Sequence, residues 1–299
     1  MIEKILCFGD GDTMNLCNID EIKALLHRHG FHFSKAKGQN FLTQNWVPRE
    51  IVAGAGIDET CGVLEVGPGI GPLTTELCAA AGKVVAIEVD TTLKPILSET
   101  MADADNLEII FGDVMKQDIA ALVQEKFEGL TPMACANLPY YITSPILAAL
   151  LECRQFAAVT VMVQKEVAQR ICAKAGSADY SAFTVFCNYY AEPEILFDVP
   201  ACCFIPQPKV TSAVITLRTR KEPPCPIQDE KLFFKVVKAS FAMRRKTLVN
   251  GLSAAFGEFS KEQLKEILVA CGLSETVRGE TLDIPQFAAI ADKIAEARG

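Results

Sequence analysis

The residues Asn137-Leu138-Pro139-Tyr140 place an amide, a stiffened backbone and an aromatic ring in four consecutive positions. They follow Met133 to Ala136, an apolar run that is typical of a buried strand. Proline fixes its own φ and pushes the residue before it toward an extended conformation. Carbonyls held in this way can accept hydrogen bonds from a planar amino group while the ring stacks on a planar ring. The stretch indicates a site for the exocyclic amine of a nucleobase. The alternative is that these residues form only a strand-to-loop turn with a half-buried tyrosine.

A glycine-rich turn, Glu65-Val66-Gly67-Pro68-Gly69-Ile70-Gly71, lies between a strand-like run at 62–64 and a helical pattern at 73–81. A strand, a glycine turn and a helix in this order bring backbone N–H groups close to a ligand at the start of the helix. The spacing G-x-G-x-G differs from the G-x-G-x-x-G of nicotinamide enzymes. Glycine turns occur in many α/β proteins, so this turn alone decides little.

The next two predicted strands, 83–87 and 107–111, are each followed by an acid, Glu88 and Asp113. Glu88 can accept hydrogen bonds from both ribose hydroxyls of a nucleoside, and Asp113 can accept one from an adenine amino group. The structural alternatives are a solvated Glu88 and an Asp113 that caps the following helix. Ligands of open α/β sheets bind at the carboxyl ends of the strands. Four consecutive strand ends that carry these residues in this order therefore favour a nucleoside cofactor.

Taken in order, these residues resemble a class I S-adenosylmethionine-dependent methyltransferase of the adenine-N6 type. Five flanking motifs make the chain similar to the bacterial small-subunit ribosomal RNA adenine dimethyltransferases of the KsgA type, and the resemblance extends from about Phe31 to the C-terminus. The motifs lie at 38–42, 164–170, 204–212, 239–248 and 278–282.

The resemblance implies a Rossmann-like α/β domain with a mostly parallel seven-stranded sheet, whose last strand is antiparallel, and a small C-terminal helical domain. It implies S-adenosyl-L-methionine as cofactor, bound by Asn40, Leu42, Gly67, Gly69, Glu88, Asp113 and Asn137. The catalytic residues that we expect are Asn137, Leu138, Pro139, Tyr140 and Phe204. Because no strong base is evident among them, catalysis must come mainly from positioning and electrostatics.

In this family the substrate is a pair of adjacent adenosines in the 3′-terminal hairpin loop of 16S rRNA, and each is methylated twice. The resemblance therefore implies 16S rRNA in an immature small ribosomal subunit as the partner, a role in subunit biogenesis, a monomer and a cytoplasmic location. Three alternatives remain. They are a 23S rRNA dimethyltransferase of the resistance type, a non-enzymatic ribosome-assembly factor, and a nicotinamide oxidoreductase, which would leave Asn137 to Tyr140 unexplained.

The composition of the 299-residue chain is that of a globular protein, with half of the residues hydrophobic. No run of 18 apolar residues and no apolar signal segment is present, so we expect neither a membrane span nor a signal peptide. The twelve cysteines include no C-x-x-C pair and indicate reduced thiols rather than disulfides or zinc. We expect no metal site, and we interpret His27, His29 and His32 as a solvated helix end.

The net charge of −8 is unusual for a protein that binds RNA. Locally the sign reverses, because Lys209 to Lys246 holds ten basic and three acidic residues. In a helix over 229–249, one face would carry Lys231, Lys235, Lys238 and Arg245. We predict that this stripe, together with Arg244 and Lys246, contacts RNA phosphates. A merely solvated helix face is the alternative.

The organisation that we predict is a leader at 1–30, a catalytic domain at 31–221 and a helical RNA-binding domain at 222–299. The proline-rich stretch 221–226 is the best candidate for a linker. Late strands are expected near 183–190 and 210–216, and helices at 229–256, 260–271 and 285–297.

Overall fold

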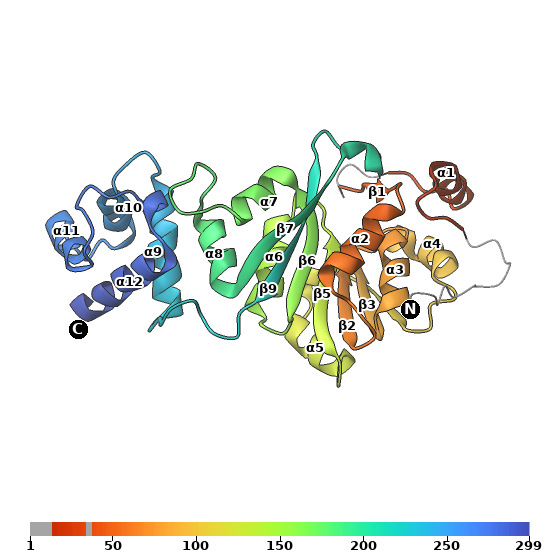
Figure 1. Ribbon diagram of the computed structural model, residues 1–299, viewed down its shortest axis with the longest axis horizontal. Helices are drawn as coiled ribbons and strands as arrows, with labels where there is room; N and C mark the ends of the chain where they lie inside the picture. Colours follow the sequence, from red (N-terminus) through yellow and green to blue (C-terminus); the bar gives the residue numbers. More distant parts are fainter. Residues whose placement is uncertain (1–13, 34–37, 299) are drawn as a thin grey trace, which may run out of the picture.

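The centre of the molecule is a seven-stranded sheet in the order β4-β3-β2-β5-β6-β9-β7 (Figure 1). The computed structural model describes residues 14–33 and 38–298. The strands are β2 (Cys61–Val66), β3 (Lys83–Glu88), β4 (Leu107–Phe111), β5 (Thr131–Asn137), β6 (Ala158–Gln164), β7 (Ala191–Val199) and β9 (Ser212–Thr219). β2 to β6 pair in parallel, whereas β9 is antiparallel to β6 and β7. The predicted sheet, with its last strand antiparallel, is confirmed.

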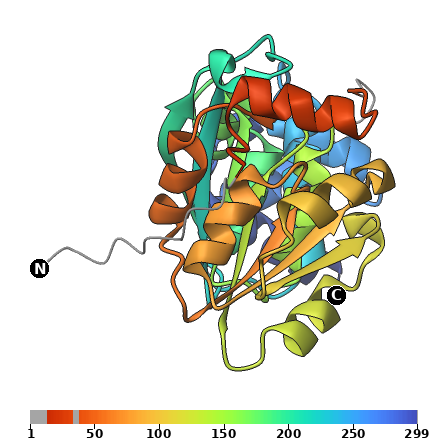
Figure 2. The same cartoon turned by 90° about the vertical axis from the view of Figure 1, so that its right-hand side faces the viewer.

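Helices cover both faces of this sheet because its central strands are apolar on both sides; every residue of β2 is buried. One face packs against α2 (Trp46–Ala55) and α3 (Pro72–Ala80), which Figure 2 shows on one side of the strands. The other face packs against α5 (Ile119–Lys126), α6 (Thr143–Glu152), α7 (Lys165–Ile171) and α8 (Ala182–Tyr190). A short second sheet pairs β1 (Phe41–Leu42) with β8 (Phe204–Ile205).

Part of the predicted leader packs on the catalytic domain. Helix α1 (Ile19–Arg28) begins at Asn18, whose side chain accepts hydrogen bonds from two backbone N–H groups of the first turn. Its buried residues Ile22 and Leu25 lie in one apolar cluster with residues of α4 (Lys94–Thr100). Glu99 of α4 forms ion pairs with Arg28 and His29. Residues 1–13 of the leader lie outside the described residues.

The strand predicted near 183–190 is wrong, because these residues form α8. The run is rich in aromatic and β-branched residues, which favour a strand when considered locally. A capping box at its start overrides this preference: the Ser181 hydroxyl accepts a hydrogen bond from the Thr184 N–H, and the Thr184 hydroxyl accepts one from the Ser181 N–H. The strand of this region is β7, which follows directly.

The C-terminal helices form a separate group at one end of the molecule (Figure 1). They are α9 (Glu230–Ala242), α10 (Leu248–Ala255), α11 (Lys261–Ala270) and α12 (Ile284–Arg298). The single helix predicted over 229–256 is wrong, since α9 ends at Ala242 and the chain turns before α10. Gly251 allows α10 to cross α9 closely: a Cβ on it would lie 2.2 Å from the Ala239 carbonyl oxygen. The proline-rich stretch 221–226 contains neither helix nor strand.

None of the helices within residues 14–33 and 38–298 combines the length and the apolar character that crossing a bilayer requires.

Candidate active site

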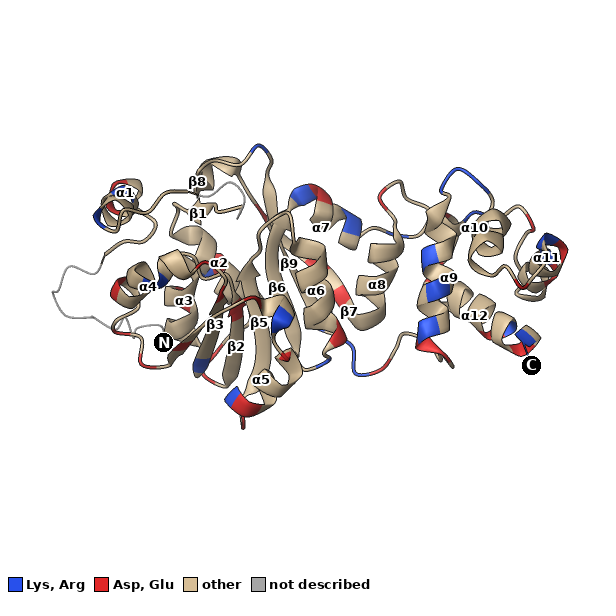
Figure 3. Cartoon of the chain, turned by 180° about the vertical axis from the view of Figure 1, so that it is seen from behind, with Lys and Arg blue, Asp and Glu red and all other residues tan. Residues whose placement is uncertain are grey.

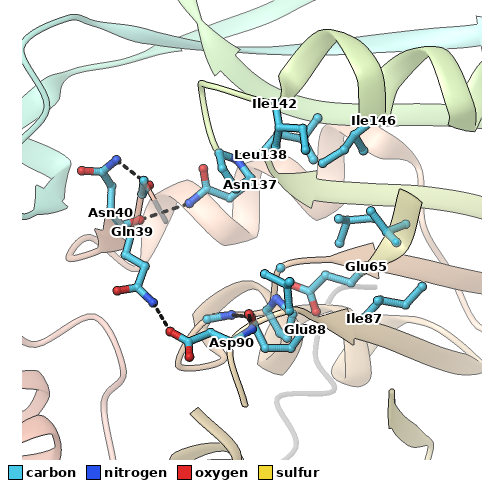
Figure 4. Close-up of a pocket in the computed structure, with 18 of the residues that line it drawn as sticks. Gln39, Asn40, Glu65, Ile87, Glu88, Asp90, Asn137, Leu138, Ile142 and Ile146 are labelled. Carbon is cyan, nitrogen blue, oxygen red and sulfur yellow. Dashed lines mark hydrogen bonds between the residues drawn. The ribbon is translucent and has the colours of Figure 1, made fainter. Parts of the chain in front are cut away.

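A cavity of about 200 Å³ opens at the carboxyl ends of β2, β3 and β5 (Figure 4). The end of β4 and the segment 38–42 also line it. The predicted site residues that line the cavity are Asn40, Leu42, Gly67, Gly69, Glu88, Asp113, Asn137, Leu138, Pro139 and Tyr140. The structure therefore brings together every predicted cofactor residue and all but one of the predicted catalytic residues.

The glycine turn takes a backbone conformation that other residues rarely adopt. Gly67 and Gly69 have φ values of 75° and 62°, in the left-handed region that favours glycine. A Cβ on Gly67 would meet no atom within 4 Å, so space is left for a ligand there, whereas one on Gly69 would lie 3.2 Å from the Phe41 ring. The turn leads directly into α3, whose first turn has no side-chain cap. Its N–H groups are available to an anionic group of a ligand.

Two buried acids at the end of β3 organise the floor of the cavity. Glu88, 4% exposed, accepts hydrogen bonds from the Gly69 N–H at 3.2 Å and the Asp90 N–H at 2.7 Å. It thereby holds the glycine turn against β3. Asp90, 3% exposed, accepts one from the Gln39 amide at 2.6 Å. No role for Asp90 or Gln39 was predicted from the sequence. Their positions could have suggested one, because Asp90 lies two residues after Glu88 and Gln39 directly precedes Asn40.

Glu65 is the third buried acid of the cavity, and in the sequence it stood out only as the start of the glycine turn. It is 1% exposed. Burial raises its pKa to about 8, a rise that the Thr74 hydroxyl reduces in part and the nearby Glu88 carboxylate reinforces. The Glu65 Oε2 atom has no hydrogen-bond partner among the residues that the structure describes. A buried carboxyl oxygen without a partner favours a ligand in the cavity that can hydrogen-bond to it.

Asp113 both caps a short helix, which was the structural alternative, and lies at the cavity. It caps a short 3-10 helix, Val114–Lys116, by accepting a hydrogen bond from the Met115 N–H at 3.0 Å. It also lines the cavity. Because the cap uses only the Oδ1 atom, the cap does not compete with a hydrogen bond from a ligand to the second oxygen.

The segment 38–42 ties two strand ends together across the cavity (Figure 4). The Gln39 amide reaches Asp90 beyond β3, and the Asn137 amide at the end of β5 donates to the Asn40 carbonyl at 3.3 Å. Leu42 is 1% exposed and pairs with Phe204 through β1 and β8. It serves as an apolar part of the wall rather than as a polar ligand.

The Asn137 to Tyr140 stretch offers two acceptors at the end of β5. The Asn137 Nδ2 donates to Asn40, which leaves Oδ1 as the acceptor of that amide. The Pro139 carbonyl already accepts from the Ile142 N–H and the Thr143 hydroxyl, both at 3.2 Å. The Leu138 carbonyl accepts none from the described residues. The second acceptor is therefore the Leu138 carbonyl.

Tyr140 and Phe204, the two rings among the expected catalytic residues, lie in different surroundings. The Tyr140 hydroxyl bonds the Ser212 hydroxyl at 2.6 Å, and burial raises the pKa of Tyr140. This ring is fixed beside the cavity. Phe204 does not line the cavity: it is 4% exposed and packs in the core with Leu42 and Val214. The structure therefore does not show the expected pair of rings.

The basic residues of the C-terminal part form two groups rather than one stripe (Figure 3). Lys231, Lys235 and Lys238 are exposed along α9. Arg244, Arg245 and Lys246 are exposed in the turn between α9 and α10, so the prediction that Arg245 shares the helix face is wrong. Lys235 lies over the Phe256 ring at 4.4 Å. Arg244 donates to the Ala178 carbonyl at 2.7 Å and so helps to hold the turn.

The cavity fits S-adenosylmethionine in chemical character. Buried acids suit its positive charges, the uncapped start of α3 suits a carboxylate, and Glu88 suits a ribose. Within residues 14–33 and 38–298 no group of three His, Cys, Asp or Glu side chains could hold a metal ion. The fold and the cavity define a class I S-adenosylmethionine-dependent methyltransferase.

Comparison with known proteins identifies the family within this class. A family model described as ribosomal RNA adenine dimethylase matches residues 30–295, and the chain belongs to this family. The prediction of an S-adenosylmethionine-dependent enzyme with a ribosomal RNA substrate is thereby confirmed.

Individual relatives agree with this assignment. The chain is 47% identical to the ribosomal RNA small subunit methyltransferase A of Geobacillus thermodenitrificans, over 91% of this chain and 94% of the relative. It is 44% identical to the protein of that name from Streptococcus gordonii, and the match covers 94% of this chain and 98% of the relative. A dimethyladenosine transferase structure from Plasmodium falciparum superposes with a TM-score of 0.72 at 25% identity, over 85% and 97%. The structure of the 23S rRNA methyltransferase ErmE shares the fold, with a TM-score of 0.65 at 24% identity. The match covers 85% of this chain and 99% of ErmE.

We expect Glu65 to make the cofactor-free protein less stable as the pH rises. Its pKa is about 8 in the folded chain and about 4.3 in the unfolded chain. Between these values only the unfolded chain has lost the proton, so raising the pH from about 5 to about 8 favours unfolding, by up to a few kcal/mol. Urea denaturation of wild type and Glu65→Gln at both pH values measures this. Parallel pH dependences would show that Glu65 is not protonated in the fold.

Glu88→Ala should weaken binding of S-adenosylmethionine while the fold survives. Hydrogen bonds to a charged acceptor are worth about 1.5–3 kcal/mol each, so we expect a loss of roughly ten-fold or more in affinity. Titration calorimetry gives the affinity and circular dichroism monitors the fold. Glu128→Ala, at an exposed position outside the cavity, is the control. An unchanged affinity in Glu88→Ala would remove Glu88 from the cofactor site.

Proposed function

We propose that this chain transfers methyl groups from S-adenosylmethionine to the N6 amines of two adjacent adenosines in the 3′-terminal hairpin loop of 16S rRNA. It methylates each twice, in an immature small ribosomal subunit, and acts as a cytoplasmic monomer. The observation that carries the proposal is the pair of acceptors at the end of β5, Asn137 Oδ1 and the Leu138 carbonyl, beside a cavity suited to the cofactor. One chain supplies both, which supports a monomer.

The residues at the end of β5 act by positioning. An adenine N6 amine is a poor nucleophile because its lone pair is delocalised into the ring. Asn137 Oδ1 and the Leu138 carbonyl accept its two N–H bonds and draw the nitrogen toward tetrahedral geometry, which directs the lone pair into the cavity. Tyr140, held by Ser212, stacks on the base. The bound cofactor supplies an electrophilic methyl group on a sulfonium whose charge is lost on transfer. Once methylated, the nitrogen is cationic and acidic enough to release its extra proton to water, so no strong base is needed.

The small-subunit assignment has more support than the large-subunit alternative. The relatives at 44–47% identity that span more than nine tenths of the chain are named small subunit methyltransferases. The 23S enzyme is a neighbour in fold at 24% identity. A protein that only assists assembly would not need the acceptors and buried acids of the cavity.

The basic turn between α9 and α10 is the better candidate for phosphate contact. Figure 3 shows this turn on the same side of the molecule, at the top of the view, as α7 and β8. The lysines of α9 extend away from that side. Arg245 and Lys246 carry positive charge without an ion-pair partner among the described residues. They supply phosphate contacts that orient the RNA without reading its sequence.

Mapping of the methylated base tests the proposed function. The protein is incubated with labelled S-adenosylmethionine and either unmodified small subunits or unmodified large-subunit rRNA, and the labelled bases are located. Two adjacent dimethyladenosines near the 3′ end of 16S rRNA are expected. Label in 23S rRNA would establish the alternative, and no label in either RNA would contradict both.

Asn137→Ala should abolish this methylation and leave the affinity for S-adenosylmethionine within a few-fold of wild type. The reason is that the amide oxygen contacts the target amine, while the acids on β2 and β3 hold the cofactor. Methyl transfer to small subunits and calorimetric titration of the cofactor measure the two effects. Near-normal methylation by this variant would end the positioning mechanism.

Replacing Arg245 and Lys246 together by Ala should weaken binding to small subunits and flatten its salt dependence. For single-stranded RNA the log–log slope falls by about 0.7 for each phosphate that the protein no longer neutralises, or roughly 1.4 for two. Cofactor affinity should not change. The matched control is Lys231→Ala with Lys238→Ala, which removes the same charge from α9. If the control loses as much affinity as the turn variant, α9 binds the phosphates. If neither changes, both groups are only solvated surface.

A further inference from the structure

Tyr141 is an exposed aromatic residue at the rim of the cavity, and neither the mechanism above nor the family motifs use it. It is 62% exposed, the most of any large hydrophobic residue within the described part of the chain. It follows Tyr140 directly and lines the cavity. Tyrosine is enriched where proteins contact partner molecules, because its ring is apolar and its hydroxyl is polar.

The ring of Tyr141 rests on the segment that closes the cavity. A Cβ added to Gly38 would lie 3.1 Å from its Cδ1 atom and 3.3 Å from its Cε1 atom. Gly38 therefore lets the ring pack against its backbone, and its φ of 62° also favours glycine. One part of the ring is supported by residue 38, and the remainder faces solvent at the mouth.

The other aromatic residues near the cavity are buried or held in place. Phe41 is 5% exposed, and Tyr140 is held by Ser212. Phe204 is buried outside the cavity. The Tyr141 hydroxyl makes no hydrogen bond, and its ring makes no aromatic contact, with the described residues. Among the described residues that line the cavity, Tyr141 is thus the most exposed aromatic residue, and its ring leaves surface for a ligand besides the base that stacks on Tyr140.

We propose that Tyr141 is a stacking platform for the unpaired RNA base next to the target adenosine. The target occupies the acceptors of Asn137 and Leu138 beside Tyr140, so the adjoining base of a single strand reaches the rim one residue further along the chain. Stacking suits this role because every base has a π-face, and the platform tolerates whichever base follows the target. With two adjacent targets, the second adenosine occupies the platform while the first is methylated. The inference rests on the proposed function for the identity of the RNA.

Steady-state methylation of unmodified small subunits by Tyr141 variants tests the platform. Tyr141→Ala should raise the KM for subunits about five-fold or more, the loss expected for one stacked base. Tyr141→Phe should behave as wild type because it keeps the ring. Tyr141→Leu should resemble Tyr141→Ala, because it keeps apolar surface but no planar face. Trp46→Ala removes an exposed ring that packs on Phe197 outside the cavity, and should change nothing in catalysis.

The outcomes separate this inference from the proposed function. If wild type does not methylate small subunits, the proposed function fails. If wild type methylates small subunits and Tyr141→Ala has the same KM and kcat as wild type, the platform proposal is wrong. If Tyr141→Ala weakens S-adenosylmethionine binding by calorimetry as much as it raises the KM, Tyr141 belongs to the cofactor rim and the inference is overturned. If Tyr141→Ala raises the KM but Tyr141→Leu keeps the wild-type KM, the side chain makes an apolar contact with the RNA instead of stacking on a base.

Discussion

The parallel register of β2, β3 and β5 is the constraint on which the site depends. Val66 pairs with Ile87, and Glu65 pairs with Cys135, so the carboxyl ends of the three strands meet at one edge. Each return to that edge requires a crossover through a helix. Residues as distant in sequence as Glu65 and Asn137 become neighbours in this way. A shift of one strand by one residue would turn its polar end residue from the cavity into an apolar layer.

The same register gathers three carboxyl groups in a poorly solvated place. Glu65, Glu88 and Asp90 are all at most 4% exposed. Backbone N–H groups donate hydrogen bonds to two of these carboxylates: Gly69 donates to Glu88, and Thr92 donates to Asp90. The Glu65 Oε2 atom lacks such a donor, and its buried carboxyl has a raised pKa. A ligand that hydrogen-bonds to the Glu65 Oε2 atom would satisfy this carboxyl.

The sheet, the cavity and most of its lining could be predicted from the sequence because those features are local. The glycine turn, the strand-end acids and the Asn137 to Tyr140 stretch each carry their chemistry within a few residues. Errors arose where distant packing decides. The aromatic run of α8 looks like a strand until Ser181 caps it and its rings meet Phe233 and Phe234 of α9. Arg245 fits a helix face by spacing, but the chain turns after Ala242. The burial of Phe204 depends on its pairing with Leu42, which no local pattern reveals.

The contacts of Glu230 fix the start of α9 to the catalytic domain. Glu230 accepts hydrogen bonds from the hydroxyls of Tyr189 and Tyr190, at 2.9 Å and 2.7 Å, and pairs at 3.0 Å with Arg154, which follows the end of α6. Burial alone would raise the pKa of Glu230, but these hydroxyls and Arg154 hold it below its usual value, so it stays ionised. Because each partner comes from α8 or the end of α6, α9 cannot swing without breaking several of these contacts together. The position of the basic turn relative to the cavity is thus set by packed helices rather than by a flexible linker.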